Sequence, residues 1–94
     1  MSNKYQIAET ELFASKIQED PYCKFIKKIN NYVYPQLKEN PFYGQNIKKL
    51  KGEYEGVYRY RIGDIRIFYI VDDNKIIVIM TDVEQRKDSY KKRK

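Results

Sequence analysis

Two runs in the second half of the chain have the residue pattern of half-buried β-strands. They cover residues 57–62 and 65–71 and are separated by Gly63-Asp64. A two-residue loop with glycine first suits a type II′ turn, because glycine takes a positive φ without steric cost. The turn therefore predicts a β-hairpin with five facing pairs: Tyr58–Tyr69, Arg59–Phe68, Tyr60–Ile67, Arg61–Arg66 and Ile62–Ile65.

The predicted hairpin has two unlike faces, because successive side chains of a strand point to opposite sides of the sheet. Tyrosines and isoleucines form one face, suited to the core, whereas Arg59, Arg61 and Arg66 share the other. Like charges that face each other destabilise a strand pair by up to about 1 kcal/mol, and a sequence selected for stability alone is expected to place a carboxylate opposite one of them. The arginines therefore indicate an anion site, with phosphate as the first candidate. The alternative is a solvated basic face that keeps an exposed strand from aggregating.

The first half of the chain predicts one short strand and two helices. Residues 4–8 resemble a strand, and Thr10 can cap a helix that runs to about residue 18. Asp20-Pro21 is a favourable start for a second helix, with aspartate at the cap and proline in the first helical position. Pro35 lies inside this second helix and is expected to kink it or to split off its last turn.

The rest of the chain predicts a loop, the hairpin, a third strand and a tail. Residues 41–56 are expected to form the loop. Residues 75–82 form the third strand, which is apolar on both faces and is therefore placed centrally, covered on both sides. Residues 83–94 are expected to form a short final helix or a basic tail. Together these elements predict a single α+β domain over residues 1–94, with the two helices packed on one face of a four-stranded, mostly antiparallel sheet.

The positive charge of the chain is unevenly placed. The whole chain of 94 residues has a formal net charge of +6. Residues 1–47 contain six lysines and five acidic residues, a balance of +1, whereas residues 48–94 contain thirteen basic and eight acidic residues, a balance of +5. A basic patch with interleaved tyrosines indicates a nucleic-acid partner, although charge alone does not separate RNA, DNA or an acidic protein.

Absent residue types exclude several classes of enzyme. With no histidine and one cysteine, the chain cannot build the usual zinc sites or a triad that needs an imidazole, and no cofactor is expected. Cys23 is expected to be a small, partly buried helical side chain. Asp72-Asp73 fits a turn better than a magnesium site. A single cysteine, together with the lack of a signal-like or membrane-spanning segment, favours the cytoplasm.

Three segments together resemble the RelE/ParE superfamily of bacterial and archaeal toxins, over nearly the whole chain. The first is Lys49-Leu50-Lys51-Gly52, the second is the hairpin at residues 58–66, and the third is Arg86-Lys87-Asp88-Ser89-Tyr90. The order of strand, two helices and three strands also fits this superfamily. The resemblance implies a cognate antitoxin protein as partner, in a toxin–antitoxin hetero-oligomer.

The RelE branch of the superfamily implies a ribosome-dependent, metal-independent endoribonuclease that cleaves mRNA in the ribosomal A site. In this chemistry the ribose 2′-hydroxyl attacks the adjacent phosphate. By resemblance, Arg61, Arg66, Arg86 and Tyr90 are the catalytic candidates, and the candidates for RNA binding are Lys49, Lys51, Arg59 and Lys87.

The residue types suit the chemistry that the resemblance implies. Fixed guanidinium groups can stabilise the charge that develops on the phosphate. Without a histidine, Tyr90 is the candidate base, with its pKa lowered by neighbouring arginines, and Arg86 would steady the leaving group. Family members often have lysine at the position of Arg59, and some have histidine at the position of Gln85. Because an arginine is a poor proton donor, the alternatives for proton transfer are Lys87, Glu84 or groups of the ribosome.

Two other functions stay open from the sequence. A ParE-like protein shares the fold but binds DNA gyrase and is not a nuclease. That branch does not need Arg61, Arg66, Arg86 and Tyr90 together, so their joint presence favours cleavage. The second is a basic RNA- or protein-binding module without activity, in which the arginines would each contribute a similar increment to binding.

Overall fold

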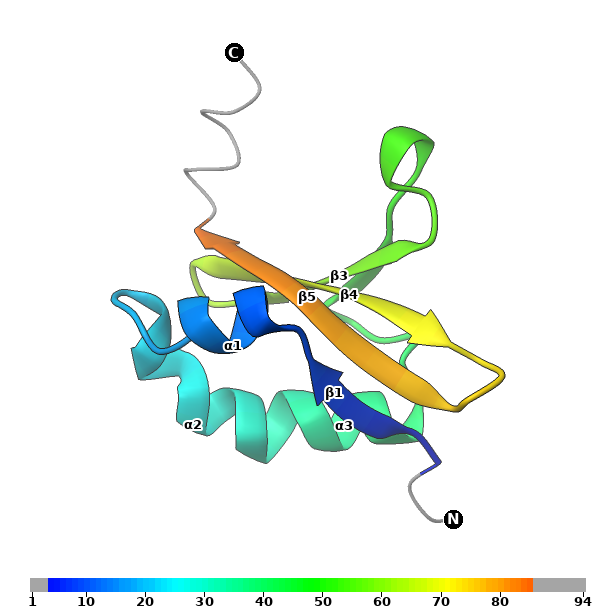
Figure 1. Cartoon of the computed structure of the whole chain (residues 1–94), viewed down its shortest axis with the longest axis horizontal. Coiled ribbons are helices and arrows are strands. Elements are labelled where there is room, and N and C mark those ends of the chain that lie inside the picture. Colours follow the sequence, from blue (N-terminus) through cyan, green and yellow to red (C-terminus); the bar gives the residue numbers. More distant parts are fainter. Residues whose placement is uncertain (1–3, 86–94) are drawn as a thin grey trace.

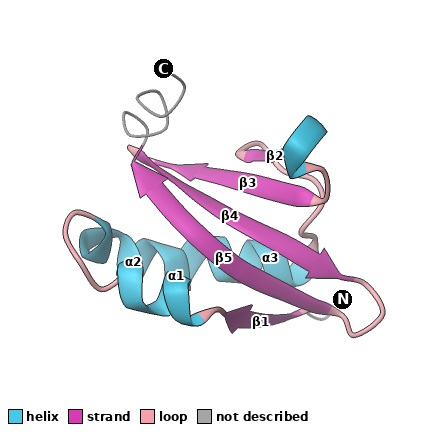
Figure 2. Ribbon diagram, turned by 45° about the horizontal axis from the view of Figure 1, so that its top comes forward, coloured by secondary structure: helices cyan, strands magenta, loops and turns pink. Residues whose placement is uncertain are grey.

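The protein folds as a five-stranded mixed sheet with helices on one face (Figures 1 and 2). The computed structural model describes residues 4–85. The strand order is β1-β5-β4-β3-β2, in which β1 runs parallel to β5 and the other neighbours are antiparallel. The strands are β1 (Gln6–Glu9), β2 (Ile47–Lys49), β3 (Val57–Ile62), β4 (Ile65–Asp72) and β5 (Ile77–Gln85). The α+β class and the mostly antiparallel sheet are confirmed.

The β3–β4 hairpin has the predicted register. All five expected pairs are present, including Arg61 opposite Arg66 and Tyr60 opposite Ile67. Gly63 has φ 57°, as the first position of a type II′ turn requires. A Cβ at Gly63 would lie 2.7 Å from the ring of Phe25, so the turn also packs closely against the helical layer.

The first helix, α1 (Glu11–Lys16), is capped as the sequence predicts. The Thr10 hydroxyl oxygen accepts a hydrogen bond from the Phe13 backbone N–H at 3.1 Å, and it also donates to the Thr81 carbonyl oxygen on β5 at 3.3 Å. The cap residue therefore joins the start of α1 to the sheet. The helix ends about two residues earlier than expected.

The second predicted helix is a continuous helical stretch of four segments. These are η1 (Tyr22–Phe25), α2 (Ile26–Lys28), the π-helical η2 (Ile29–Val33) and α3 (Tyr34–Glu39). The expected start at Asp20 is wrong in detail, because Pro21 occupies the cap position without a side-chain cap hydrogen bond. The Asp20 carboxylate instead accepts a hydrogen bond from the Cys23 thiol at 3.3 Å.

Pro35 is accommodated without a break in the helical stretch. Proline lacks an N–H, and its ring collides with the carbonyl four residues earlier in a regular helix. Here the preceding segment winds as a π-helix, and the Tyr34 N–H bonds to the carbonyl oxygen of Ile29, five residues earlier. The wider turn makes room for Pro35 at the start of α3. The helical stretch therefore changes type just before Pro35, and α3 begins there as a separate segment.

Three expectations about the sheet are wrong. The sheet has five strands rather than four, because β2 lies inside the predicted loop at residues 41–56. The last strand continues to Gln85, through three residues that the pattern assigned to the tail. β5 lies between β1 and β4, but β4 is the middle strand of the sheet. The half-buried Ile77 and Ile79 show that the outer face of β5 is not fully covered.

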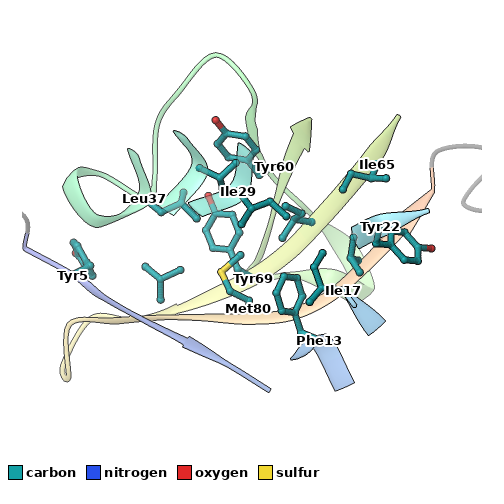
Figure 3. Close-up of a cluster of buried hydrophobic side chains, with 14 residues drawn as sticks. Tyr5, Phe13, Ile17, Tyr22, Ile29, Leu37, Tyr60, Ile65, Tyr69 and Met80 are labelled. Carbon is teal, nitrogen blue, oxygen red and sulfur yellow. The ribbon is translucent and has the colours of Figure 1, made fainter. Parts of the chain in front are cut away.

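The core lies between the sheet and the helices (Figure 3). Phe13, Val33 and Leu37 from the helices and Ile67 and Tyr69 from β4 are fully buried. The buried Tyr69 hydroxyl donates a hydrogen bond of 2.7 Å to the Pro41 carbonyl oxygen, which ties the segment after α3 to the middle strand. The predicted core face of the hairpin is thus confirmed.

Asp72 and Asp73 both accept structural hydrogen bonds. One Asp72 carboxylate oxygen accepts hydrogen bonds of 3.1 Å from the backbone N–H groups of Asn74 and Lys75, and Asp73 accepts one of 2.7 Å from the Tyr5 hydroxyl. The expected turn role is confirmed. Within residues 4–85, no helix is long and apolar enough to cross a membrane.

Substitution of Tyr69 by Phe is expected to lower the free energy of unfolding by about 1–3 kcal/mol, because the buried Pro41 carbonyl oxygen loses its donor. Urea unfolding followed by circular dichroism measures the change. Tyr43→Phe is the matched control, because Tyr43 is 78% exposed and lies two residues from Pro41. Its effect should stay within about 0.5 kcal/mol. Equal stability of the two variants would show that the buried hydrogen bond contributes nothing.

The same tyrosine is expected to make stability fall at alkaline pH. Burial raises the pKa of Tyr69, with smaller contributions from Tyr58 and Tyr60. An unfolded tyrosine has a pKa of about 10, so above that pH the unfolded chain loses this proton first. The stabilisation is therefore complete below about pH 10 and is lost above it. In Tyr69→Phe the fall with pH should be shallower, and an identical pH profile would contradict this account.

Candidate nucleic-acid interface

The face of the sheet away from the helices carries the three arginines of the hairpin. On β3 and β4 they alternate with buried core residues such as Tyr60 and Ile67. Because facing residues of antiparallel strands lie on the same side, Arg59, Arg61 and Arg66 share this open face. The register thus brings together the three arginines that the sequence grouped.

A groove of about 570 Å³ lies on the open face. Two of the predicted arginines, Arg59 and Arg66, line it together with Lys48 from β2. The other lining residues are four aromatic or aliphatic side chains (Leu50, Tyr54, Val57 and Phe68) and three polar or acidic ones (Thr81, Asp82 and Glu84). The groove can therefore offer cations and apolar surface to the same ligand.

Arg59 carries its charge in a partly desolvated place. Its Nε is buried and has no hydrogen-bond partner within residues 4–85. Burial lowers the pKa of Arg59, and the neighbouring charges of Arg66 and Arg61 lower it further. A bound anion would relieve both effects, because it supplies an acceptor and an opposite charge.

Carboxylates also stand on the open face, contrary to the expectation from the hairpin alone. The third strand of the meander, β5, places Glu84 opposite Arg66 and Asp82 opposite Phe68. An irregularity in the pairing between Phe68 and Tyr69 leaves Thr81 as an extra residue, and its hydroxyl donates to the Phe68 carbonyl oxygen at 3.1 Å. The charge cluster is therefore mixed, with Glu84 beside one of the arginines.

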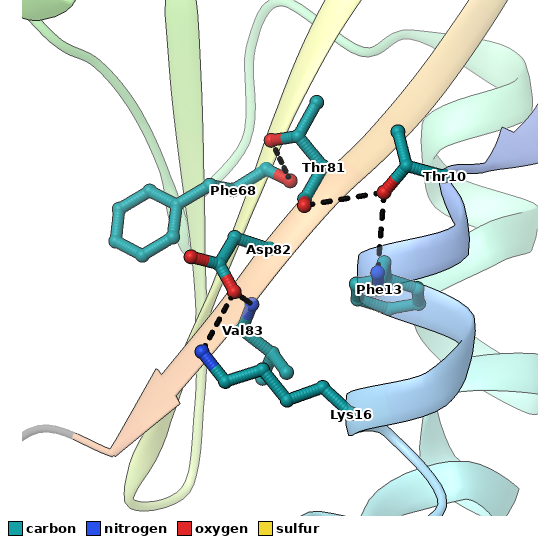
Figure 4. Close-up of polar contacts among 7 residues, drawn as sticks. All are labelled: Thr10, Phe13, Lys16, Phe68, Thr81, Asp82 and Val83. Atoms are coloured by element: carbon teal, nitrogen blue, oxygen red, sulfur yellow. Dashed lines mark hydrogen bonds and ion pairs between the residues drawn. The ribbon is translucent and has the colours of Figure 1, made fainter.

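Asp82 is already neutralised by a residue of the helical layer (Figure 4). One of its carboxylate oxygens accepts a hydrogen bond of 2.8 Å from Lys16 on α1 and another of 2.8 Å from the backbone N–H of Val83. Both side chains are about one third exposed. The groove therefore has less negative character than its two carboxylates suggest.

Two of the predicted RNA-binding lysines, Lys49 and Lys51, do not line the groove. Lys48 pairs with Arg59 and shares the open face, whereas Lys49 pairs with Tyr58 and alternates to the other side. Lys51 is exposed just before η3 (Gly52–Tyr54) and does not line the groove. The sequence analysis does not identify Lys48 as a site residue, because it predicts a loop where β2 lies and a loop gives no alternation of side chains between two faces.

Arg61 is exposed at the tip of the hairpin, on the same face but outside the groove lining. Arg86, Lys87 and Tyr90 lie outside the described residues. Their assigned roles therefore stay predictions.

The tyrosines with shifted pKa among residues 4–85 are hydrogen-bond donors rather than bases. Burial, together with a hydrogen bond to Glu9, raises the pKa of Tyr34, and burial also raises that of Tyr69. Tyr34 donates to Glu9 at 2.6 Å beside a second hollow of about 660 Å³ between β1 and α3, which none of the arginines lines. These phenols keep their protons at neutral pH, so none of them replaces Tyr90 as the candidate base.

Arg61→Gln is expected to raise the free energy of unfolding by a few tenths of a kcal/mol to about 1 kcal/mol, because it removes a like charge opposite Arg66. Urea unfolding at low ionic strength measures the gain, which should shrink at about 0.5 M NaCl. Arg61→Lys is the control that keeps the charge and should stay near the wild type. A less stable glutamine variant would show that Arg61 makes a favourable contact in the free protein.

Comparison with known sequences identifies the family. The chain matches the family model described as "ParE toxin of type II toxin-antitoxin system, parDE" over residues 14–90. It is also 42% identical over 68 residues to a curated protein of Methanocaldococcus jannaschii named "Putative toxin RelE1". That match covers 70% of this chain and 73% of the relative.

Solved structures share the fold. The toxin–antitoxin complex RelBE2 from Mycobacterium tuberculosis gives a TM-score of 0.75 at 21% identity, covering 92% of this chain and 95% of that chain. The RelB–RelE antitoxin–toxin complex from Methanococcus jannaschii gives 0.66 at 25% identity, with 90% and 96% covered. The isolated E. coli RelE toxin gives 0.66 at 19% identity, with 94% and 97% covered. The chain thus belongs to the ParE toxin family of the RelE/ParE superfamily and is a RelE-like toxin of a type II toxin–antitoxin system.

Proposed function

We propose that this toxin is a ribosome-dependent endoribonuclease that cleaves mRNA in the ribosomal A site and so inhibits translation in the cytoplasm. The observation that carries the proposal is the groove on the open face, in which Arg59 and Arg66 lie with Lys48. The buried Nε of Arg59 has no acceptor among the described residues, which supports the binding of an anionic ligand there. A phosphodiester supplies both the charge and the acceptors.

The proposed reaction needs only groups of the chain and of the RNA. The ribose 2′-hydroxyl attacks the adjacent phosphorus, its proton passes to a base, and the 5′-oxygen leaves with a proton, which gives a cyclic phosphate and a free 5′-hydroxyl. Arg66 and Arg59 would stabilise the charge that develops on the phosphate oxygens. Tyr90 is the candidate base and Arg86 the group that steadies the leaving oxygen. Arg61, exposed on the same face, would hold a neighbouring phosphate.

A cognate antitoxin is the second proposed partner. The structures from M. tuberculosis and M. jannaschii are antitoxin–toxin complexes, in the latter case of RelB with RelE. We expect the antitoxin of this chain to form a hetero-oligomer with it and to neutralise it with an acidic or amphipathic segment against the basic face. Such a segment would compete with RNA for Arg59 and Arg66.

Inhibition of DNA gyrase is a second candidate, favoured by the family description, which is that of a ParE toxin. A gyrase inhibitor would not require phosphate-binding arginines in a groove. The two functions therefore differ in what happens to messages during growth arrest: cleavage produces new 5′ ends inside translated codons, whereas gyrase inhibition leaves messages intact.

The Arg66→Ala variant is expected to cleave mRNA on the order of 10²-fold more slowly than the wild type, or slower still, because a phosphate-stabilising group is lost. Tyr90→Phe should abolish cleavage while ribosome binding stays nearly unchanged. Both are measured by primer extension on mRNA bound to purified ribosomes and in cells after induction. Lys27→Ala is the control: Lys27 is an exposed cation on α2, in the helical layer away from the groove.

The proposal fails if the wild type arrests growth without new 5′ ends. Loss of DNA supercoiling in the same cells would then establish the gyrase function. Circular dichroism of Arg66→Ala separates a loss of activity from a loss of folding.

A further inference from the structure

We propose that the aromatic part of the open-face groove binds a nucleobase of a single-stranded RNA, stacked between Tyr54 and Phe68. The inference rests on the proposed function, because it names the part of an RNA substrate that this part of the groove would hold. It adds a base-binding subsite to the phosphate-binding arginines, and Tyr54 is its defining residue.

Tyr54 presents an aromatic ring to open space. It is the last residue of η3, it lines the groove, and it is 61% exposed. The η3 turn stands clear of the sheet on the side away from the helices (Figures 1 and 2). A Cβ at either Gly52 or Gly56 would meet no described atom within 4 Å, so little packs around the turn. The ring can therefore meet a flat ligand without rearrangement of the core.

The floor of this subsite is apolar and lies next to the cations. Phe68, Val57 and Leu50 are half-buried side chains that line the same groove. Phe68 stands opposite Arg59 in the β3–β4 register, so an aromatic ring and a guanidinium group start from adjacent positions on one face. A nucleotide has the same layout, with a base linked through its sugar to a phosphate. Stacking of a base on aromatic side chains tolerates any sequence, because every base has a π-face.

The charge of the groove favours a polyanion. Asp82 is paired with Lys16, and Glu84 lies beside Arg66 in the register. The cations of β2 and β3, Lys48 and Arg59, are adjacent in the register and lie on the strands that lead into and out of the turn holding Tyr54. Alternation of cations with aromatic residues along one groove is the arrangement by which proteins bind single-stranded nucleic acids. We therefore favour RNA over a protein segment as the occupant.

The test measures binding of a short RNA that carries 2-aminopurine at one nucleotide, because stacking quenches the fluorescence of this base. A 2′-deoxy sugar at that nucleotide prevents cleavage by 2′-hydroxyl attack. The wild type at low salt should quench the fluorescence, and Tyr54→Leu should bind on the order of 10-fold more weakly with the quenching lost. Tyr54→Phe keeps the ring and should behave as the wild type.

An abasic RNA of the same length is the matched ligand. It keeps the phosphates, so Tyr54→Leu should bind it as tightly as the wild type does, whereas Arg66→Ala should bind both RNAs more weakly. The inference is overturned if Tyr54→Leu binds the 2-aminopurine RNA as the wild type does, or loses affinity equally for the abasic RNA. Weaker binding of the antitoxin alone, with RNA binding unchanged, would also overturn it and assign Tyr54 to a protein interface. Failure of the proposed function is separate, because it appears as the absence of ribosome-dependent cleavage by the wild type.

Discussion

The pairing register of β3 and β4 is the constraint on which the rest of this structure depends. Side chains alternate with a period of two, so a slip of one residue would move every side chain of a strand to the other face. Here a slip would place Arg59 and Arg61 in the core and expose Tyr60. The turn at Gly63 prevents this, since it fixes the pairing at the hairpin tip and packs against Phe25 of the helical layer. One short turn therefore supports both the core and the basic face.

The open face carries a charged group whose partial burial costs stability. Arg59 is partly desolvated, and the charges around it lower its pKa further. A protein without a ligand at this place gains nothing from a buried guanidinium nitrogen that lacks an acceptor. The neighbouring Lys16–Asp82 pair shows that the fold can neutralise a charge of the same groove with a side chain of its own. This contrast supports the proposal that Arg59 binds an anion.

The sequence predicts the structural features that follow from local rules, but not those that depend on the pairing of strands far apart in the chain. The hairpin register, the Thr10 cap and the core face follow from alternation and turn chemistry, and all are confirmed. β2 is three residues long and lies at the edge of the sheet, too short to give a period. Because β2 cannot be predicted from the pattern, neither can the position of Lys48 beside Arg59 on the open face. The position of Glu84 beside Arg66 depends on β5 and on an irregularity in its pairing with β4, which no local pattern encodes.

The two faces of the sheet differ in composition: the helix-side face holds the core, and the open face carries the groove. Substitutions of Arg59 and Arg66 are expected to leave the core intact, because neither is among the buried core residues. On this fold we therefore expect function to depend on the groove residues rather than on the architecture. β5 ends at Gln85, one residue beyond Glu84, which pairs with Arg66. Arg86 is the next residue in the sequence, so the proposed cleavage needs only a short length of chain between the groove and the remaining catalytic candidates.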